Sequence, residues 1–197
     1  MISTSYGYNE ADLTPFYENR QCNEYMKLGL QGVTILYSSG DYGVAGNDGE
    51  CIDGTTGNYT APGANYGLFN PSFPATCPYI TSVGATQVAT GSTVTQPEQA
   101  AESVIYSGGG FSNVFPLPSY QSSAVKSYFQ NHNPPYGADR YNNSQMTRGY
   151  PDISANGVNY VLAVDGNFSL VYGTSKPLPL YTLLIFSFTH SITPPFS

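Results

Sequence analysis

An unbroken apolar and β-branched run at residues 33–38 (VTILYS) constrains the fold of this chain more than any other feature. Such a run is typical of a parallel strand that is buried on both faces of a sheet. A shorter strand-like run lies at residues 2–6. Between the two, Thr14 is the expected N-cap of a helix, with Pro15 at its first position and Gly32 just past its end. Strand, helix and strand in this order form a βαβ unit, so we expect a layered α/β sheet.

The remaining elements follow from the same rules. Further strands are expected at residues 80–86, 160–164 and 168–172, a helix at 119–130, and loops at 43–72 and 131–143. Asp165-Gly166-Asn167 predicts a tight hairpin between the last two strands, because Asp-Gly supplies the positive φ angles that such a turn needs. Apolar residues recur at helical spacing in the first helix and predict its buried face: Phe16, Cys22, Tyr25, Met26 and Leu30.

The composition limits the classes of function that this chain can have. Only 10% of the 197 residues are charged and 40% are hydrophobic, which is typical of a compact protein. The net charge of -7 leaves few cations to neutralise phosphates, so nucleic acid is not expected as a partner. The apolar segment 178–188 is too short and too interrupted by proline to cross a membrane, and no signal peptide is recognisable. The pI of about 4.5 suits a protein that works in acid, although simple solubility explains it equally well.

Three cysteines leave one unpaired if the other two bridge. Cys51 and Cys77 flank a stretch rich in Gly, Asn and Pro and are the expected pair, while Cys22 is expected as a buried thiol in the first helix. Glycosylation sequons occur at Asn58, Asn142 and Asn167 and favour a secreted protein.

Three short stretches carry candidate chemistry. Asp41, in Gly40-Asp41-Tyr42-Gly43, follows the buried strand at its carboxyl end, where open α/β sheets place their sites, but a turn aspartate before glycine has the same sequence. Ser175, in Gly-Thr-Ser, is a candidate nucleophile that needs a base and an oxyanion site beside it. A glycine run at residues 107–112 (SGGGFS) permits close approach of backbone, and lacks the features of a nucleotide-binding loop.

Histidine is not the expected base. The chain has two, His132 in an Asn- and Pro-rich loop and His190 near the C-terminus, and neither has the neighbours that a catalytic imidazole requires. A Ser-His-Asp triad is therefore not expected.

Five motifs occur together in an order that resembles the sedolisins, the serine-carboxyl peptidases, and among them the secreted fungal tripeptidyl-peptidases. They are GVTILYSSGDYGVAG from residue 32, NPSFPATCPYITSVGAT from 70, SGGGFSNVFPLPSY from 107, YPDISA from 150 and YGTS from 172. The resemblance covers residues 2–175. It implies an incomplete subtilisin-like α/β fold, a layered parallel sheet flanked by helices.

The resemblance implies chemistry with carboxyl groups in place of histidine. Ser175 would be the nucleophile, Asp41 would line the oxyanion hole, and Ser107, Gly108, Gly109 and Gly110 would bind substrate. A neutral Asp41 carboxyl can donate a hydrogen bond to an oxyanion, whereas an ionised one would repel it, so activity is expected in acid. Peptides or proteins are the expected substrates, and the parent protein is expected to be an extracellular, monomeric glycoprotein.

The catalytic Glu and Asp of the family precede the strand at residue 2 in its members, so no residue here matches them; Glu10 and Asp12 match non-catalytic family positions. Members also carry a calcium site after Gly-Thr-Ser, whereas no acidic residue follows Asp165 here, so calcium is expected only for the full-length family member and no cofactor for this chain. We expect residues 1–175 to be a partial peptidase domain. Residues 176–197 are expected to be a tail foreign to the family, and translation of an intron is our hypothesis for its origin.

Three interpretations stay open: a truncated acid peptidase that is inactive as this chain, a peptide-binding pseudoenzyme without the acid–base pair, and a binding or structural domain of unrelated function. Two geometric expectations accompany the first. The Phe73–Pro74 peptide bond should be cis, and the carboxyl group of Asp41 should lie within several ångströms of the Ser175 hydroxyl.

Overall fold

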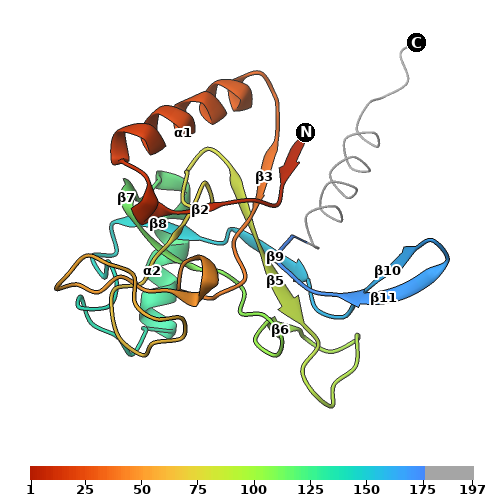
Figure 1. Ribbon diagram of the computed structural model, residues 1–197. Coiled ribbons are helices and arrows are strands. Elements are labelled where there is room, and N and C mark those ends of the chain that lie inside the picture. The colour runs from red at the N-terminus through yellow and green to blue at the C-terminus, as the bar shows by residue number, and fades with distance from the viewer. Residues whose placement is uncertain (176–197) are drawn as a thin grey trace, which may run out of the picture.

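The centre of the protein is a mixed sheet, shown in the computed structural model of Figure 1, which describes residues 1–175. Four strands run parallel in the order β1–β3–β5–β9, and the short β6 pairs antiparallel with the end of β5. Their bounds are β1 Ile2–Thr4, β3 Ile35–Ser38, β5 Thr81–Gln87, β6 Gln99–Ala100 and β9 Ile153–Asn156. The α/β architecture expected from the sequence is confirmed, and the antiparallel β6 is an addition to it.

The helix α1 (Pro15–Leu30) links β1 to β3 and begins where its cap predicts. The hydroxyl oxygen of Thr14 accepts a hydrogen bond from the N–H of Tyr17 at 3.3 Å, and Pro15 occupies the first position, where no N–H is needed. Beyond the end of the helix, Gly32 has a φ of 81°. This left-handed conformation suits glycine and turns the chain toward β3.

The predicted buried face of α1 is wrong at its two ends. Phe16 and Leu30 are each 82% exposed, whereas Glu18 and Cys22 are buried. The 3.6-residue period predicts that a face exists, but the disulfide at Cys22 sets which side of the helix turns inward, and Glu18 lies one turn before it on that side.

The predicted disulfide is also wrong. Cys22 is bonded to Cys77, with their Cα atoms 5.6 Å apart, and Cys51 is a buried free thiol. The reason is the packing of α1 on the turn that precedes β5. Cys22, Ile35, Phe73 and Cys77 belong to one buried cluster, so this pair lies within bonding distance although 55 positions separate it in sequence.

Smaller elements surround the central sheet. They are β2 (Tyr8–Asn9) paired with β4 (Ser72–Phe73), β7 (Gly110–Pro116) paired with β8 (Thr147–Tyr150), β10 (Tyr160–Val164) paired with β11 (Asn167–Val171), α2 (Ser122–Asn131), and the 3-10 turns η1 (Glu10–Asp12), η2 (Asn47–Gly49) and η3 (Ser119–Gln121). The helix α2 packs against β7 through Val125, Phe129 and Phe111. None of the described helices has the length and apolar character needed to cross a membrane.

Two local expectations are confirmed. Asp165 and Gly166 form the turn between β10 and β11 with φ angles of 49° and 78°, as the Asp-Gly signal predicts. The Phe73–Pro74 bond is cis, and so is Tyr150–Pro151. The expected tail, residues 176–197, lies outside the described residues, so the domain division at residue 175 stays a prediction.

Candidate active site

Asp41 lies three residues beyond Ser38, the last residue of β3, at the carboxyl end of the parallel sheet. Gly40 precedes it with a φ of 105°, a value that glycine adopts without strain, and Ser39 is buried. The sheet thus directs Asp41 to the edge where parallel α/β folds usually place their sites.

The residue before Ser175 binds Asp41 directly. Thr174 donates its backbone N–H to Oδ1 of Asp41 at 2.7 Å and its hydroxyl to the same oxygen at 2.9 Å. The Thr174 hydroxyl in turn accepts the N–H of Gly40 at 3.2 Å. Two segments that lie 133 positions apart are therefore joined by three hydrogen bonds, with Thr174 itself buried.

Gly173 completes this junction. Its N–H donates to the carbonyl of Gly157, just beyond β9, and its φ is 131°. A Cβ atom at this position would lie 3.2 Å from Oδ2 of Asp41, so the second carboxyl oxygen faces Gly173. The structure thus places Ser175, which is half-buried, one residue away from the partner of Asp41. The convergence of the two segments agrees with the sequence prediction, while the distance to the Ser175 hydroxyl itself stays a prediction.

The glycine run is joined to the same junction. The N–H of Gly108 donates to Gly40 at 2.7 Å, and that of Gly109 donates to Gly43 at 3.1 Å. A Cβ on Gly108 would lie 2.1 Å from the carbonyl oxygen of Ser39, which explains why this position needs glycine.

These bonds bear on substrate binding by residues 107–110. The N–H groups of Ser107, Gly108 and Gly109 all donate within the chain, and Gly110 opens β7. A bound peptide can therefore pair with this segment only by donating its N–H groups to the carbonyl groups of the segment, unless these internal hydrogen bonds open. The predicted substrate-binding role of the four residues stays a prediction.

Glu10 and Asp12, which the sequence analysis assigned to non-catalytic positions, form hydrogen bonds away from Asp41. Glu10 is buried and accepts hydrogen bonds from the hydroxyl of Ser112 and from the N–H of Asn113, the latter at 2.7 Å. Asp12 accepts one from the hydroxyl of Tyr59. Burial raises the pKa of Glu10, and these donors lower it in part.

One titratable residue was missed by sequence reasoning. Glu18 on α1 is fully buried, and neither of its carboxyl oxygens has a hydrogen-bond partner in the part of the chain that the structure describes. Burial, with a further contribution from the charge of Glu10, raises the pKa of Glu18 to about 8. Only its place four residues before Cys22 could have indicated burial.

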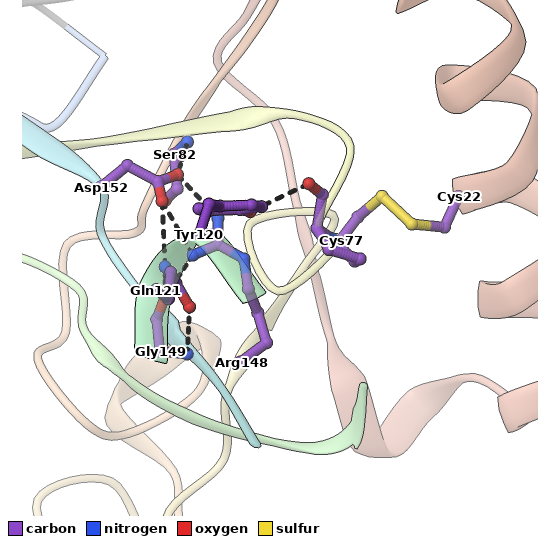
Figure 2. A network of polar contacts seen from close by, with 9 residues as sticks. Cys22, Cys77, Ser82, Tyr120, Gln121, Arg148, Gly149 and Asp152 are labelled. Atoms are coloured by element: carbon purple, nitrogen blue, oxygen red, sulfur yellow. Dashed lines mark hydrogen bonds and ion pairs between the residues drawn. A yellow bond between two sulfur atoms is a disulfide. The ribbon is translucent and has the colours of Figure 1, made fainter. Parts of the chain in front are cut away.

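A buried charged network fixes the strands beside the site (Figure 2). The Arg148 guanidinium is fully buried and binds both carboxyl oxygens of Asp152, at 2.8 and 2.6 Å, and Asp152 also accepts the N–H of Ser82 at 2.8 Å. Gln121 donates to Asp152 at 3.1 Å and exchanges two hydrogen bonds with the backbone of Gly149. The network thereby joins β8, β5 and η3 to the residue that immediately precedes β9.

Neither histidine chemistry nor a metal is indicated by the described residues. His132 is the C-cap residue after α2 and packs against the ring of Tyr128, with the ring centroids 6.3 Å apart. His190 lies outside the described residues. Within residues 1–175, no group of three or more His, Cys, Asp or Glu side chains is placed to hold a metal ion.

Comparison of the sequence with known proteins identifies relatives among fungal peptidases. Aorsin of Aspergillus oryzae is 46% identical over 201 residues, and Tripeptidyl-peptidase SED1 of Arthroderma otae is 42% identical over 205 residues. Both alignments cover 94% of this chain but only 30% of the relative, so the chain spans about a third of the length of the curated relatives it matches. No family model matches the chain.

The fold has a counterpart among solved structures. A Pseudomonas sedolisin, a serine-carboxyl proteinase solved with two molecules of pseudo-iodotyrostatin, matches with a TM-score of 0.64 and 22% identity over 98% of this chain and 50% of that one. The fold of this chain is therefore sedolisin-like, as the order of the five motifs led us to expect. Over the residues that align, the chain is homologous to part of the fungal tripeptidyl-peptidases, and its fold is similar to that of a sedolisin.

Proposed function

We propose that this chain carries the nucleophile and the oxyanion site of an acid-acting serine-carboxyl peptidase, with Ser175 and Asp41 in these roles. The observation that carries the proposal is the pair of hydrogen bonds from Thr174 to Asp41, which joins the Gly-Thr-Ser turn to the carboxyl end of β3.

The geometry supports these roles of Ser175 as nucleophile and Asp41 as oxyanion site. Thr174 occupies Oδ1 of Asp41 with two donors, which leaves Oδ2 as the oxygen that carries the proton when Asp41 is neutral. As the Ser175 hydroxyl adds to a peptide carbonyl, the carbonyl oxygen gains negative charge, and the Oδ2 proton stabilises it by a hydrogen bond. The serine proton passes to a Glu that a neighbouring Asp supports, as the family resemblance implies. The Glu returns this proton to the amide nitrogen as the intermediate collapses and the C–N bond breaks, and water then hydrolyses the ester on Ser175.

Substrates and setting extend the proposal. Peptides are the proposed substrates, and tripeptide release is favoured because two close relatives bear the name tripeptidyl-peptidase. We propose an extracellular, monomeric parent glycoprotein, with Asn58 and Asn167 as the accessible sequons, because both are exposed whereas Asn142 is half-buried. Calcium binding by the parent remains an expectation from the family.

The test is a chimera in which residues 1–175 replace the aligned part of Arthroderma otae Tripeptidyl-peptidase SED1. We expect tripeptide release in acid, reduced about 10⁴-fold or more by Ser175→Ala and about 10²- to 10³-fold by Asp41→Ala. Ser123→Ala and Asp139→Ala, at exposed positions, are the matched controls. A folded chimera whose activity survives Ser175→Ala would contradict the proposal.

An activity assay of the 197-residue chain alone tests whether this chain supplies its own general base. We expect no peptidase activity between pH 3 and 7, because loss of the general base costs a factor of about 10⁴ to 10⁶ in turnover. Activity that depends on Ser175 would show that the chain supplies its own base, and Glu10 and Asp12 would be the first residues to replace. A chain that binds peptides while the chimera stays inactive would favour the pseudoenzyme.

A further inference from the structure

An apolar pocket of about 640 Å³ lies beside the candidate site. This volume is within the range of about 300–1,000 Å³ that small-molecule and side-chain pockets occupy. Gly43, two residues from Asp41, forms part of its wall, and so do Ser107, Gly109 and Gly110 of the glycine run. The pocket therefore shares residues with the segment that is bonded to the Asp41 turn.

Aromatic rings form much of the wall. Phe111 of β7 and Tyr128 of α2 have ring centroids 5.9 Å apart, and Phe111 lies 6.0 Å from Tyr141. On the other side, Phe69 stacks on Tyr141 at 6.1 Å and meets Tyr136 edge to face at 5.2 Å. These five rings line one cavity and connect through Tyr141.

One cation supports these walls without lining the cavity. The Arg140 guanidinium lies 5.0 Å from the centroid of the Phe69 ring and 5.6 Å from that of Tyr136. Its Nε–H donates to the carbonyl of Gly67 at 2.7 Å, which fixes the side chain. Such cation–π contacts favour the observed positions of the two rings.

Charge is missing from the lining. Among the described residues around the cavity there is no Asp, Glu, Lys or Arg. Its polar members, apart from the tyrosines, are Ser107, Asn113, Gln121, His132, Asn133 and Asn142. A charged side chain entering it would lose its hydration without gaining a partner, whereas a large apolar side chain would bury its surface against the rings.

We propose that this pocket binds a large aromatic or aliphatic side chain of the substrate peptide and so determines specificity for such peptides. The inference rests on the proposed peptidase function and adds the substrate class. A peptide is the occupant because the pocket is continuous with the Gly43 and Ser107–Gly110 backbone next to Asp41. An aromatic ring fits the edge-to-face and offset contacts that the wall offers.

The experiment measures binding to the full 197-residue chain by titration calorimetry at pH 5. The probes are five peptides, acetyl-Gly-Ala-X-Ala-Gly amides with X as Phe, Leu, Ala, Asp or Lys. We expect the Phe peptide to bind about 10- to 100-fold more tightly than the Ala, Asp and Lys peptides, since this is the gain from burying one large apolar side chain.

Two substitutions locate the effect. Val44 lines the pocket, is 40% exposed and belongs to no catalytic group, so Val44→Trp should fill the cavity and remove the preference for Phe. Val44→Asp should reverse it in favour of the Lys peptide. Val94, which is 84% exposed and absent from the lining, gives the matched controls Val94→Trp and Val94→Asp, which should bind like the wild-type chain. Thermal melting verifies that each variant folds.

The outcomes separate the two proposals. Equal affinities for all five peptides, or an unchanged preference in a folded Val44→Trp chain, would overturn the specificity inference and leave the proposed function standing. Absence of binding to every peptide would also overturn the specificity inference, and the chimera would then test the proposed function independently. Reversal of the preference by Val44→Asp is a result that mere loss of structure cannot produce.

Discussion

Glu18 and Glu10 place two carboxyl groups in the same part of the protein interior, one on α1 and one on η1. Glu10 is 3% exposed and has two donors, while Glu18 is fully buried and has none among the described residues. Burial raises the pKa of both groups, and the charge of Glu10 contributes to the shift of Glu18, to about 8. The folded chain therefore holds a proton on Glu18 that the unfolded chain releases near pH 4.5.

Replacement of Glu18 by Gln should make folding less dependent on pH. Because the folded pKa of Glu18 lies above its ordinary value of 4.5, its neutral form stabilises the fold fully below about pH 4.5, and this stability is lost as the pH rises toward 8. Glu18→Gln should change little at pH 4 and raise the free energy of unfolding by several kcal/mol at pH 8, since one pKa unit corresponds to about 1.4 kcal/mol.

Urea unfolding at pH 4, 6 and 8 measures this difference. Glu24→Gln is the matched control on the same helix, because Glu24 is exposed and its pKa is lowered, first by a hydrogen bond from Lys27. Curves for wild type and Glu18→Gln that stay parallel over this range would contradict a buried, protonated Glu18.

The Arg148–Asp152 pair should contribute far more to the free energy of unfolding than the surface ion pairs of α1 do. Asp152→Ala leaves the fully buried Arg148 without its bidentate partner, and we expect a loss of about 3–5 kcal/mol in the free energy of unfolding. Glu24→Ala breaks the exposed pairs with Arg20 and Lys27 and should cost less than about 1 kcal/mol. Equal losses of unfolding free energy in the two variants would contradict the buried Arg148–Asp152 pair drawn in Figure 2.

Local sequence signals predicted the elements well, because they act over a few residues. The Thr14 cap, the Pro15 start and the Asp165-Gly166 turn each depend on neighbours in the chain, and each is found where expected. The inward side of α1 depends instead on contacts with a turn 55 residues away at Cys77, and for this reason Phe16 was predicted to be buried and is not.

The site was predictable where motif and topology coincide. A carboxyl-end position made Asp41 a candidate, and the ordered motifs added Ser175. The direct partner of Asp41, Thr174, was not predicted, because a hydrogen bond across 133 positions leaves no periodic signal. The aromatic pocket was not predicted either, since Phe69, Phe111 and Tyr141 come from three separate segments that meet only in the folded chain.

Loss of the Cys22–Cys77 disulfide should destabilise the chain, while loss of Cys51 should not do so to the same extent. The bridge closes a loop with a sequence separation of 55 residues, and the chain-entropy relation assigns about 4 kcal/mol to a loop of that length. The double variant Cys22→Ala/Cys77→Ala should lower the free energy of unfolding by that order, whereas Cys51→Ala removes one buried thiol and should cost about 1 kcal/mol. Peptide mapping without reduction tests the connectivity itself: Cys22 and Cys77 should appear in one linked pair of peptides, and Cys51 should react with a thiol reagent only after unfolding. A linked Cys51–Cys77 peptide would restore the pairing first expected from the sequence and contradict the packing of α1 described above.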